Sequence, residues 1–310
     1  MQYSHIPVML NEVIECLNPQ PGQNFVDCTI GGGGHSAEIL KRVAPNGKVL
    51  GIDLDAEAIK KVKSLEKKLI LVQDNFANLD KILKEEKIGH VHGILLDLGI
   101  SSAEYESGKG FSFQKDELLD MRFGTVNGYN LTAEDIVNKW SKDKLIKIFK
   151  EYGEERLAGK IANRIIEERY KDRIETSKKL GDLIFSEYKK AYKNKTFKKH
   201  PATKVFQSLR IAVNHELENL ESVLPQALLS LEKGGRIAII SFHSLEDRIV
   251  KKFFVKESNG CVCPPEFPIC KCGYKPALKI ITKKPLLPSD EEVNKNPRSR
   301  SAKLRVAERI

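Results

Sequence analysis

Four consecutive glycines, Gly31 to Gly34, are the part of the chain best suited to bind a ligand. They follow an apolar segment that ends on Asp27 and precede a helix-like run, and a second apolar segment ends on Asp53. Glycines at such a turn let the backbone approach a ligand with no Cβ in the way. An acid about 20 residues beyond the turn, at the tip of the next strand, can accept hydrogen bonds from a ribose diol. The pattern predicts a site for a nucleoside-containing cofactor.

The identity of that nucleoside is open at this point. Residues 32–37 fit the G-x-G-x-x-G/A dinucleotide fingerprint, so a nicotinamide or flavin enzyme is one interpretation. Asp27 favours another, because a carboxylate beside the turn suits a cation better than a pyrophosphate. S-adenosylmethionine carries an amino group and a sulfonium and no phosphate. We therefore rank a methyltransferase above a dehydrogenase, and both above a turn that serves only packing.

Further polar residues follow other apolar segments: Asp74 to Phe76, Asp97, and Ser241 to His243. Ligands of open parallel sheets bind at the carboxyl ends of the strands, so we expect these residues to share one edge. Phe76 is placed to flank an adenine, or else to fill the core. Asp97 follows the most apolar segment of the chain and is expected next to both the methyl donor and the methyl acceptor.

These residues need an α/β framework to position them. Strands and helices alternate over the first 100 residues and return after residue 222, which predicts a Rossmann-like methyltransferase sheet. Residues 101–130 are expected to form a long loop, and residues 131–221 are almost entirely helical in pattern. The predicted fold class is α/β with an inserted all-helical domain, the methyltransferase domain being 1–104 and 222–310 and the insert 105–221. The expected strands are 24–28, 48–53, 69–73, 92–98, 235–240, 277–282 and 302–307.

Basic residues are concentrated in the insert. The 310-residue chain has a net charge of +10, and residues 142–204 hold 19 Lys and Arg against 10 Asp and Glu. Such a patch is the electrostatic footprint of a polyanion, and we prefer nucleic acid to a merely solvated surface. The sequence lacks a signal-peptide pattern and a membrane-length apolar run, so a soluble cytoplasmic protein with no membrane partner is expected.

Four of the six cysteines cluster near the C-terminus as two C-x-C pairs, Cys261 with Cys263 and Cys270 with Cys272. In a cytosolic chain this grouping favours zinc over disulfides. The pairs are tighter than the usual C-x-x-C spacing, so the sequence leaves the metal unknown. Cys16 and Cys28 lie in apolar surroundings and are expected in the core.

With these residues in place, the chain resembles the bacterial ribosomal RNA small-subunit methyltransferase H family of the MraW type, essentially from end to end. The motifs that carry the resemblance are HIPV (5–8), GGHS (33–36), DLGISS (97–102), GFSF (110–113), LDMR (119–122), YGEER (152–156), HPAT (200–203), QSLRIAVN (207–214), ISFHSLEDR (240–248) and NPRSRSAKLR (296–305).

The resemblance implies methylation of the exocyclic N4 of a cytidine in the decoding region of 16S ribosomal RNA, with S-adenosyl-L-methionine as cofactor. The implied partner is small-subunit RNA in an assembled or nearly assembled subunit. The oligomeric state is left open, with a homodimer allowed. The cofactor-binding residues implied by the family motifs are Gly33, Gly34, His35, Asp53, Phe76, Asp97 and Glu104. The family usually has Gln where this chain has Glu104, so that contact departs from the pattern.

Three roles stay open. Asp97, the candidate catalytic residue, could accept the N4 proton or bind only the cofactor. Phe111 and Phe113 could stack on a splayed-out base, although anchoring of their loop is the somewhat stronger interpretation. Two rival functions are a nicotinamide oxidoreductase and a non-catalytic RNA-binding assembly factor, although a binding module would not need the acids at the strand ends.

Overall fold

A computed structural model describes the chain except for residues 1–5, 66–67, 101, 125–129, 194–195, 198–199, 262, 264–266 and 268–271. The chain divides into two compact units, Met1–Gly99 with Leu217–Ile310, and Ile100–Glu216. Both boundaries lie five residues before those predicted from the sequence, so Glu104 belongs to the second unit rather than the first. Each unit is described by itself below.

The first unit is built on a seven-stranded sheet with the order β3-β2-β1-β4-β5-β7-β6. Strands β1 to β5 are parallel, and β7 runs antiparallel to both β5 and β6. All seven predicted strands are present, although the reversed direction of β7 was not foreseen. The strands are β1 (Phe25–Asp27), β2 (Val49–Asp53), β3 (Ile70–Gln73), β4 (Val91–Asp97), β5 (Leu231–Ser241), β6 (Leu278–Ile280) and β7 (Lys303–Arg309).

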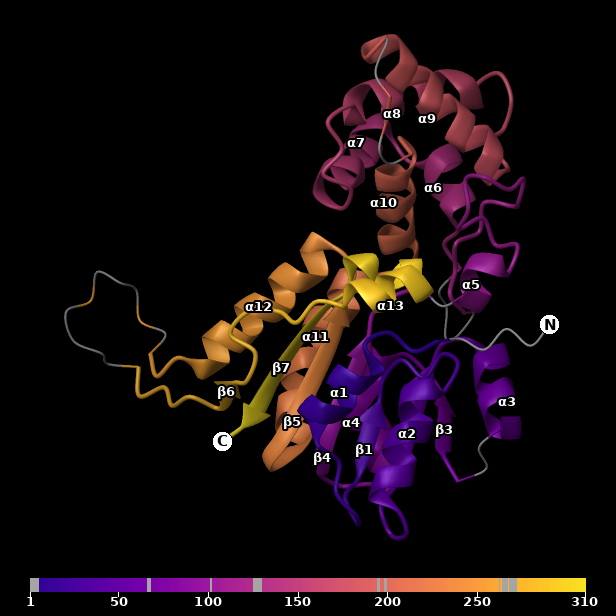
Figure 1. Cartoon of the computed structure of the whole chain (residues 1–310). Coiled ribbons are helices and arrows are strands. Elements are labelled where there is room, and N and C mark those ends of the chain that lie inside the picture. The colour runs from indigo at the N-terminus through magenta and orange to yellow at the C-terminus, as the bar shows by residue number, and fades with distance from the viewer. Residues whose placement is uncertain are drawn as a thin grey trace. The chain divides into compact units, whose positions relative to one another are not determined.

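Helices cover both faces of this sheet (Figure 1). Alternate strand residues point to opposite sides, so Val26 packs in one buried cluster and Phe25 in the other. The first cluster takes in the inward faces of α4 (Leu79–Glu85), α11 (Glu216–Ser230) and α12 (Ser244–Ser258). The second takes in α1 (Leu10–Leu17), α2 (Gly34–Val43) and α3 (Ala56–Leu65). The sheet is thus the middle of three layers, as in other α/β folds.

Two helices of the first unit were not predicted: α1 and α13 (Asp290–Lys295). Both are short, and α13 is polar along its whole length apart from Val293. They are tied together across the chain, because the Met9 amide donates to the Glu292 carboxylate at 2.7 Å. A long-range contact of this kind leaves no periodic signal in the sequence.

The second unit is helical, as predicted. Its helices are α5 (Ser102–Glu106), α6 (Ala133–Lys139), α7 (Lys142–Glu151), α8 (Ala158–Arg169), α9 (Ser177–Ala191) and α10 (Thr203–Asn214). Side chains cap several of them: Thr132 and Asp135 form a capping box at α6, and Thr176 caps α9. These helices enclose one buried apolar cluster.

The segment expected to be one long loop contains α5 and is fastened to the helices beyond it. The Leu119 amide donates to the Glu175 carbonyl at 2.9 Å, and the Ser177 amide donates to the Glu117 carbonyl at 2.9 Å. Phe111 is buried and stacks on Phe123 with ring centroids 5.7 Å apart. Its segment is therefore part of the core of the second unit.

Candidate functional site

The carboxyl ends of three neighbouring strands bring three aspartates to one edge of the sheet. Asp27 ends β1 and pairs in register with Gly51 of β2 and Leu95 of β4. Asp53 and Asp97 come two residues later on those flanking strands. Because β1 lies between β2 and β4, the sheet order places Asp27 between the other two acids. The strand-edge arrangement expected from the sequence is thus present.

The glycine turn is fastened to the tip of β2 through Asp53. The Gly31 amide donates to one oxygen of the Asp53 carboxylate at 2.9 Å, and the Asp55 amide donates to the other at 2.9 Å. Burial raises the pKa of Asp53 to about 6. A carboxylate has about four lone-pair positions, so two remain for a diol.

Gly33 closes the turn in a conformation that favours glycine. Its φ is +77°, and a Cβ there would lie 3.1 Å from the methyl groups of Val62. Helix α2 begins immediately afterwards, and its first α-helical hydrogen bond runs from Ala37 to the Gly33 carbonyl at 2.9 Å. The amides of Gly34 and His35 precede that bond and are directed away from the helix. They are suited to a carboxylate or another anionic group.

Asp27 occupies the centre of the edge and is buried. It is 1% exposed and accepts hydrogen bonds from the Ser36 hydroxyl at 2.7 Å and the Thr29 amide at 3.1 Å. The Thr29 hydroxyl in turn accepts from the Asp97 amide at 2.7 Å. The prediction that Asp27 neighbours a cationic ligand stays a prediction, because these hydrogen bonds within the protein do not test it. Asp27 positions the turn, and the signal that could have shown this was the Thr two residues after the acid.

His35 and Asp97 form the part of the edge best suited to a cation. His35 Nε2 lies 2.9 Å from the Val8 carbonyl, which can only accept, so Nε2 carries the proton. Burial lowers the pKa of His35 to about 4, so the ring is neutral and Nδ1 has a free lone pair. That nitrogen lies 3.9 Å from Asp97 Oδ2. Two acceptors thus face one another and favour a donor between them.

Asp97 has a second unusual feature. Its Oδ1 is buried with no hydrogen-bond partner among the residues that the structure describes. Burial, followed by the nearby charges of Asp27 and Glu246, raises the pKa of Asp97 to about 7. A buried acceptor without a donor is costly, and a cationic N–H group would satisfy it. The hydrogen-bond acceptors of Asp97 and His35 therefore fit an ammonium group.

Phe76 and His243 stand at the remaining strand ends. Phe76 begins the short helix η1 (Phe76–Asn78), where Asn75 accepts from the Ala77 amide, and it packs half-buried against the sheet core. His243 caps α12 in a capping box with Glu246. The ring of Phe76 has both a packing contact and an exposed part, so its place beside an adenine stays a prediction.

The second unit holds the other candidates. Glu104 lies on α5 of the second unit, and its contact with the cofactor stays a prediction. Phe113 stacks on His200 with centroids 4.2 Å apart and meets Phe206 edge-on at 5.4 Å. Together with buried Phe111, this favours loop anchoring over base stacking for both rings.

Comparisons with known proteins identify the family of this chain. The model of the MraW methylase family matches residues 2–310. The ribosomal RNA small subunit methyltransferase H of Carboxydothermus hydrogenoformans is 48% identical over 100% of this chain and 99% of its own length. The enzyme of that name from Clostridium botulinum strain Kyoto is also 48% identical and covers 100% of both chains.

A solved structure, an rRNA methylase from Streptococcus thermophilus, covers 100% of this chain and 99% of its own, with 11% identity and a TM-score of 0.43. The chain belongs to the MraW methylase family, whose methyl donor is S-adenosylmethionine. The enzyme is therefore a methyltransferase, and the nicotinamide oxidoreductase is excluded. No helix within the described ranges is long and apolar enough to cross a membrane.

The raised pKa of Asp97 predicts a pH-dependent cost to stability. An unfolded aspartate ionises near pH 4, so between that pH and about 7 the folded protein holds a proton that the unfolded chain has lost. The contribution of Asp97 to the free energy of unfolding is therefore complete below about pH 4, falls between about pH 4 and 7, and is lost above about pH 7. Asp97→Asn cannot ionise, so it should raise the melting temperature of the ligand-free protein at pH 8, by roughly 2 °C or more.

At pH 5 the same variant should gain much less. Asp80→Asn is the control, since Asp80 is exposed on α4 and paired with Lys84. An equal change for Asp97→Asn at both pH values would contradict the assignment of a raised pKa.

Proposed function

We propose that this protein transfers the methyl group of S-adenosylmethionine to the exocyclic N4 of a cytidine in the decoding region of 16S ribosomal RNA. One group carries the site: the buried Asp97 carboxylate beside the glycine turn, whose Oδ1 has no donor among the described residues and whose Oδ2 lies 3.9 Å from Nδ1 of the neutral His35. The relatives' name supplies the RNA class. The base and its reacting atom come from the family resemblance in the motifs of this chain.

The described residues suggest how the cofactor would be held. Asp53 has lone pairs left for the ribose diol, and the amides at the start of α2, from Gly34 and His35, suit the carboxylate of the methionine part. Asp97 and His35 Nδ1 suit its ammonium group. Phe76 would flank the adenine. Glu104, from the second unit, is the one proposed contact that differs from the family pattern.

The chemistry asks little of the protein beyond placement. The N4 lone pair of cytosine is conjugated with the ring and is a weak nucleophile, whereas the bound cofactor supplies a strongly activated sulfonium methyl. The enzyme must align the two and provide an acceptor for one N4 proton. Asp97, at the end of β4, could accept that proton, as aspartate can from cytosine N4–H. A cation beside it would lower its pKa and keep it ionised.

The decisive experiment uses labelled S-adenosylmethionine with small subunits that lack the modification, followed by mass mapping of the labelled nucleotide. Label on N4 of one cytidine supports the proposal. Binding to subunits without transfer would instead identify an RNA-binding assembly factor, and label elsewhere would leave a methyltransferase of another specificity.

Asp97→Asn separates its two roles. If Asp97 accepts the N4 proton, kcat should fall about 100-fold or more while the cofactor Kd changes less than about tenfold. An equal loss in both, measured by single-turnover kinetics and calorimetry, would restrict Asp97 to cofactor binding. Some decrease of cofactor affinity is expected in either case, because Asp97 is also proposed to bind the ammonium group, and the remaining lone pair of His35 should limit that decrease.

Asp53→Ala should weaken cofactor binding about ten- to a hundredfold, because hydrogen bonds to a charged group contribute roughly 1.5–3 kcal/mol. Calorimetric titration with S-adenosylmethionine measures it. Asp80→Ala removes an exposed carboxylate of the same unit and should leave the affinity unchanged. Because Asp53 also holds the Gly31 amide, Asp53→Asn is a second test that preserves bulk. Wild-type affinity in both variants would remove Asp53 from the site.

The basic residues around the end of α9 should provide much of the RNA affinity. Lys189, Lys190 and Lys193 are exposed there, and Lys195, Lys198 and Lys199 follow in the sequence outside the described residues. Replacing all six with Gln should flatten the salt dependence of subunit binding, by about 0.7–0.9 in slope for each phosphate that is no longer neutralised. Cofactor affinity should not change.

A matched control replaces exposed lysines of the first unit, Lys41, Lys60 and Lys84, with Gln. Filter binding at several salt concentrations compares the two variants. If the six-fold variant keeps the wild-type salt slope, its lysines form only a solvated surface. Arg298, Arg300 and Lys303 near the C-terminus are then the next candidates, whereas Arg305 is buried and paired with Asp247.

A further inference from the structure

The segment between α12 and β6 forms an excursion from the first unit that carries four of the six cysteines (Figure 1). Hydrogen bonds close its base, since the Ala277 amide donates to the Glu257 carbonyl at 2.8 Å and the Tyr274 hydroxyl donates to the Glu257 carboxylate. Beyond the base, its described side chains bury little: Cys261 and Cys272 are exposed, and Phe267 is 55% exposed. Packing alone gives such a segment little to hold it in place.

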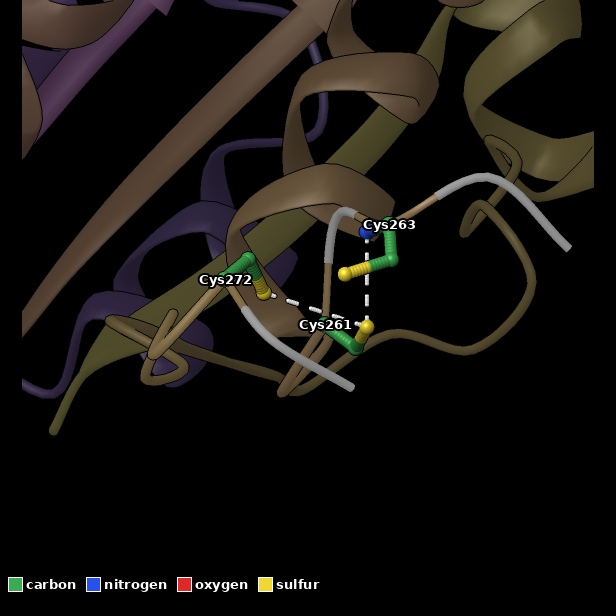
Figure 2. A group of neighbouring side chains, drawn as sticks. All are labelled: Cys261, Cys263 and Cys272. Carbon is green, nitrogen blue, oxygen red and sulfur yellow. Dashed lines mark hydrogen bonds between the residues drawn. The ribbon is translucent and has the colours of Figure 1, made fainter. Parts of the chain in front are cut away.

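Three cysteine sulfurs converge within this excursion (Figure 2). The sulfurs of Cys261, Cys263 and Cys272 all lie within 4.8 Å of one another, and those of Cys261 and Cys272 are 3.9 Å apart. Ligands of a tetrahedral zinc ion with Zn–S bonds of about 2.3 Å are about 3.8 Å from each other. A disulfide would need about 2.05 Å. The spacing is therefore that of thiolates that share one ion.

Backbone amides point at two of these sulfurs. The Cys263 amide donates to Cys261 Sγ at 3.4 Å, and the Tyr274 amide donates to Cys272 Sγ at 3.4 Å (Figure 2 draws the first). Each donor lies two residues after its acceptor. Hydrogen bonds of this kind stabilise an ionised sulfur and orient it toward a metal. One cysteine of each C-x-C pair, Cys261 and Cys272, thus accepts from the amide two residues further along the chain.

We propose that Cys261, Cys263 and Cys272 bind one zinc ion, with the remaining thiol of the second pair, Cys270, as the fourth ligand. Cys270 lies outside the described residues, and its assignment comes from the sequence. Four protein ligands leave no open coordination position, so the ion is structural and takes no part in methyl transfer. It would fix the excursion to its base at Glu257.

The test is metal analysis of the full chain purified without chelator and without a histidine tag. We expect about one zinc per chain, and less than about 0.1 in Cys261→Ser, Cys272→Ser and Cys270→Ser. Cys16→Ser is the matched control, because Cys16 packs against the sheet core of the same unit, away from the three cysteines. This variant should keep about one zinc per chain. Cobalt added to the metal-free wild type should give the thiolate charge-transfer and visible bands of a tetrahedral site.

Other results would overturn the proposal. One is wild-type protein with less than about 0.1 zinc, freely titratable thiols and no tetrahedral cobalt spectrum. Another is an intact mass that shows disulfides in place of thiols in the protein as purified. Zinc retained by Cys261→Ser or Cys272→Ser would place the ion elsewhere. None of these readouts depends on methyl transfer, so they are independent of the proposed function.

Discussion

The hydrogen bonds of the buried Asp27 carboxylate are the interactions on which the arrangement of the strand ends depends. This carboxylate accepts hydrogen bonds from the Ser36 hydroxyl of α2 at 2.7 Å and from the Thr29 amide at 3.1 Å. The Thr29 hydroxyl accepts a hydrogen bond from the Asp97 amide of β4 at 2.7 Å. One buried acid therefore sets the start of a helix against the ends of two strands. A buried carboxylate is tolerated only when it is hydrogen-bonded, so these contacts leave the glycine turn little freedom to move.

The edge also concentrates negative charge away from water. Burial raises the pKa of Asp27 and Asp53 to about 6 and that of Asp97 to about 7, and Asp27 adds to the shift of Asp97. A protein selected for stability alone would gain nothing from a buried, partly unpartnered acid such as Asp97, whereas in the proposed function this carboxylate is preorganised for a cation. The lone pair of the neutral His35 acts in the same direction. The cost in the ligand-free state is recovered when a cation binds.

The sequence was sufficient for the parallel part of the sheet, because β1 to β4 are short apolar runs that end on a polar residue, as at Asp53 and Asp97. It was insufficient for α1 and α13, whose tie runs from Met9 to Glu292 across the chain. It could not reveal the hydrogen bonds of Asp27, since an acid at a strand tip has the same sequence pattern whether it faces a ligand or a buried hydroxyl. The tautomer of His35 depends on the Val8 carbonyl, a backbone group that no motif can reveal.

In the proposed function, the first unit uses buried acids to bind the cofactor and the second uses exposed lysines to bind RNA. The charges of the strand edge are buried, so dissolved ions screen them little. The lysines around the end of α9 are exposed, so dissolved ions screen their interactions beyond a Debye length of about 8–10 Å. Salt should therefore weaken contacts with RNA far more than those with the cofactor. Phe111 and Phe113 pack with the core of the second unit and hold their loop in place. The proposed contribution of this unit's surface to RNA binding is therefore its positive charge. If the proposed function holds, we expect the base to be recognised by groups near Asp97 at the strand edge.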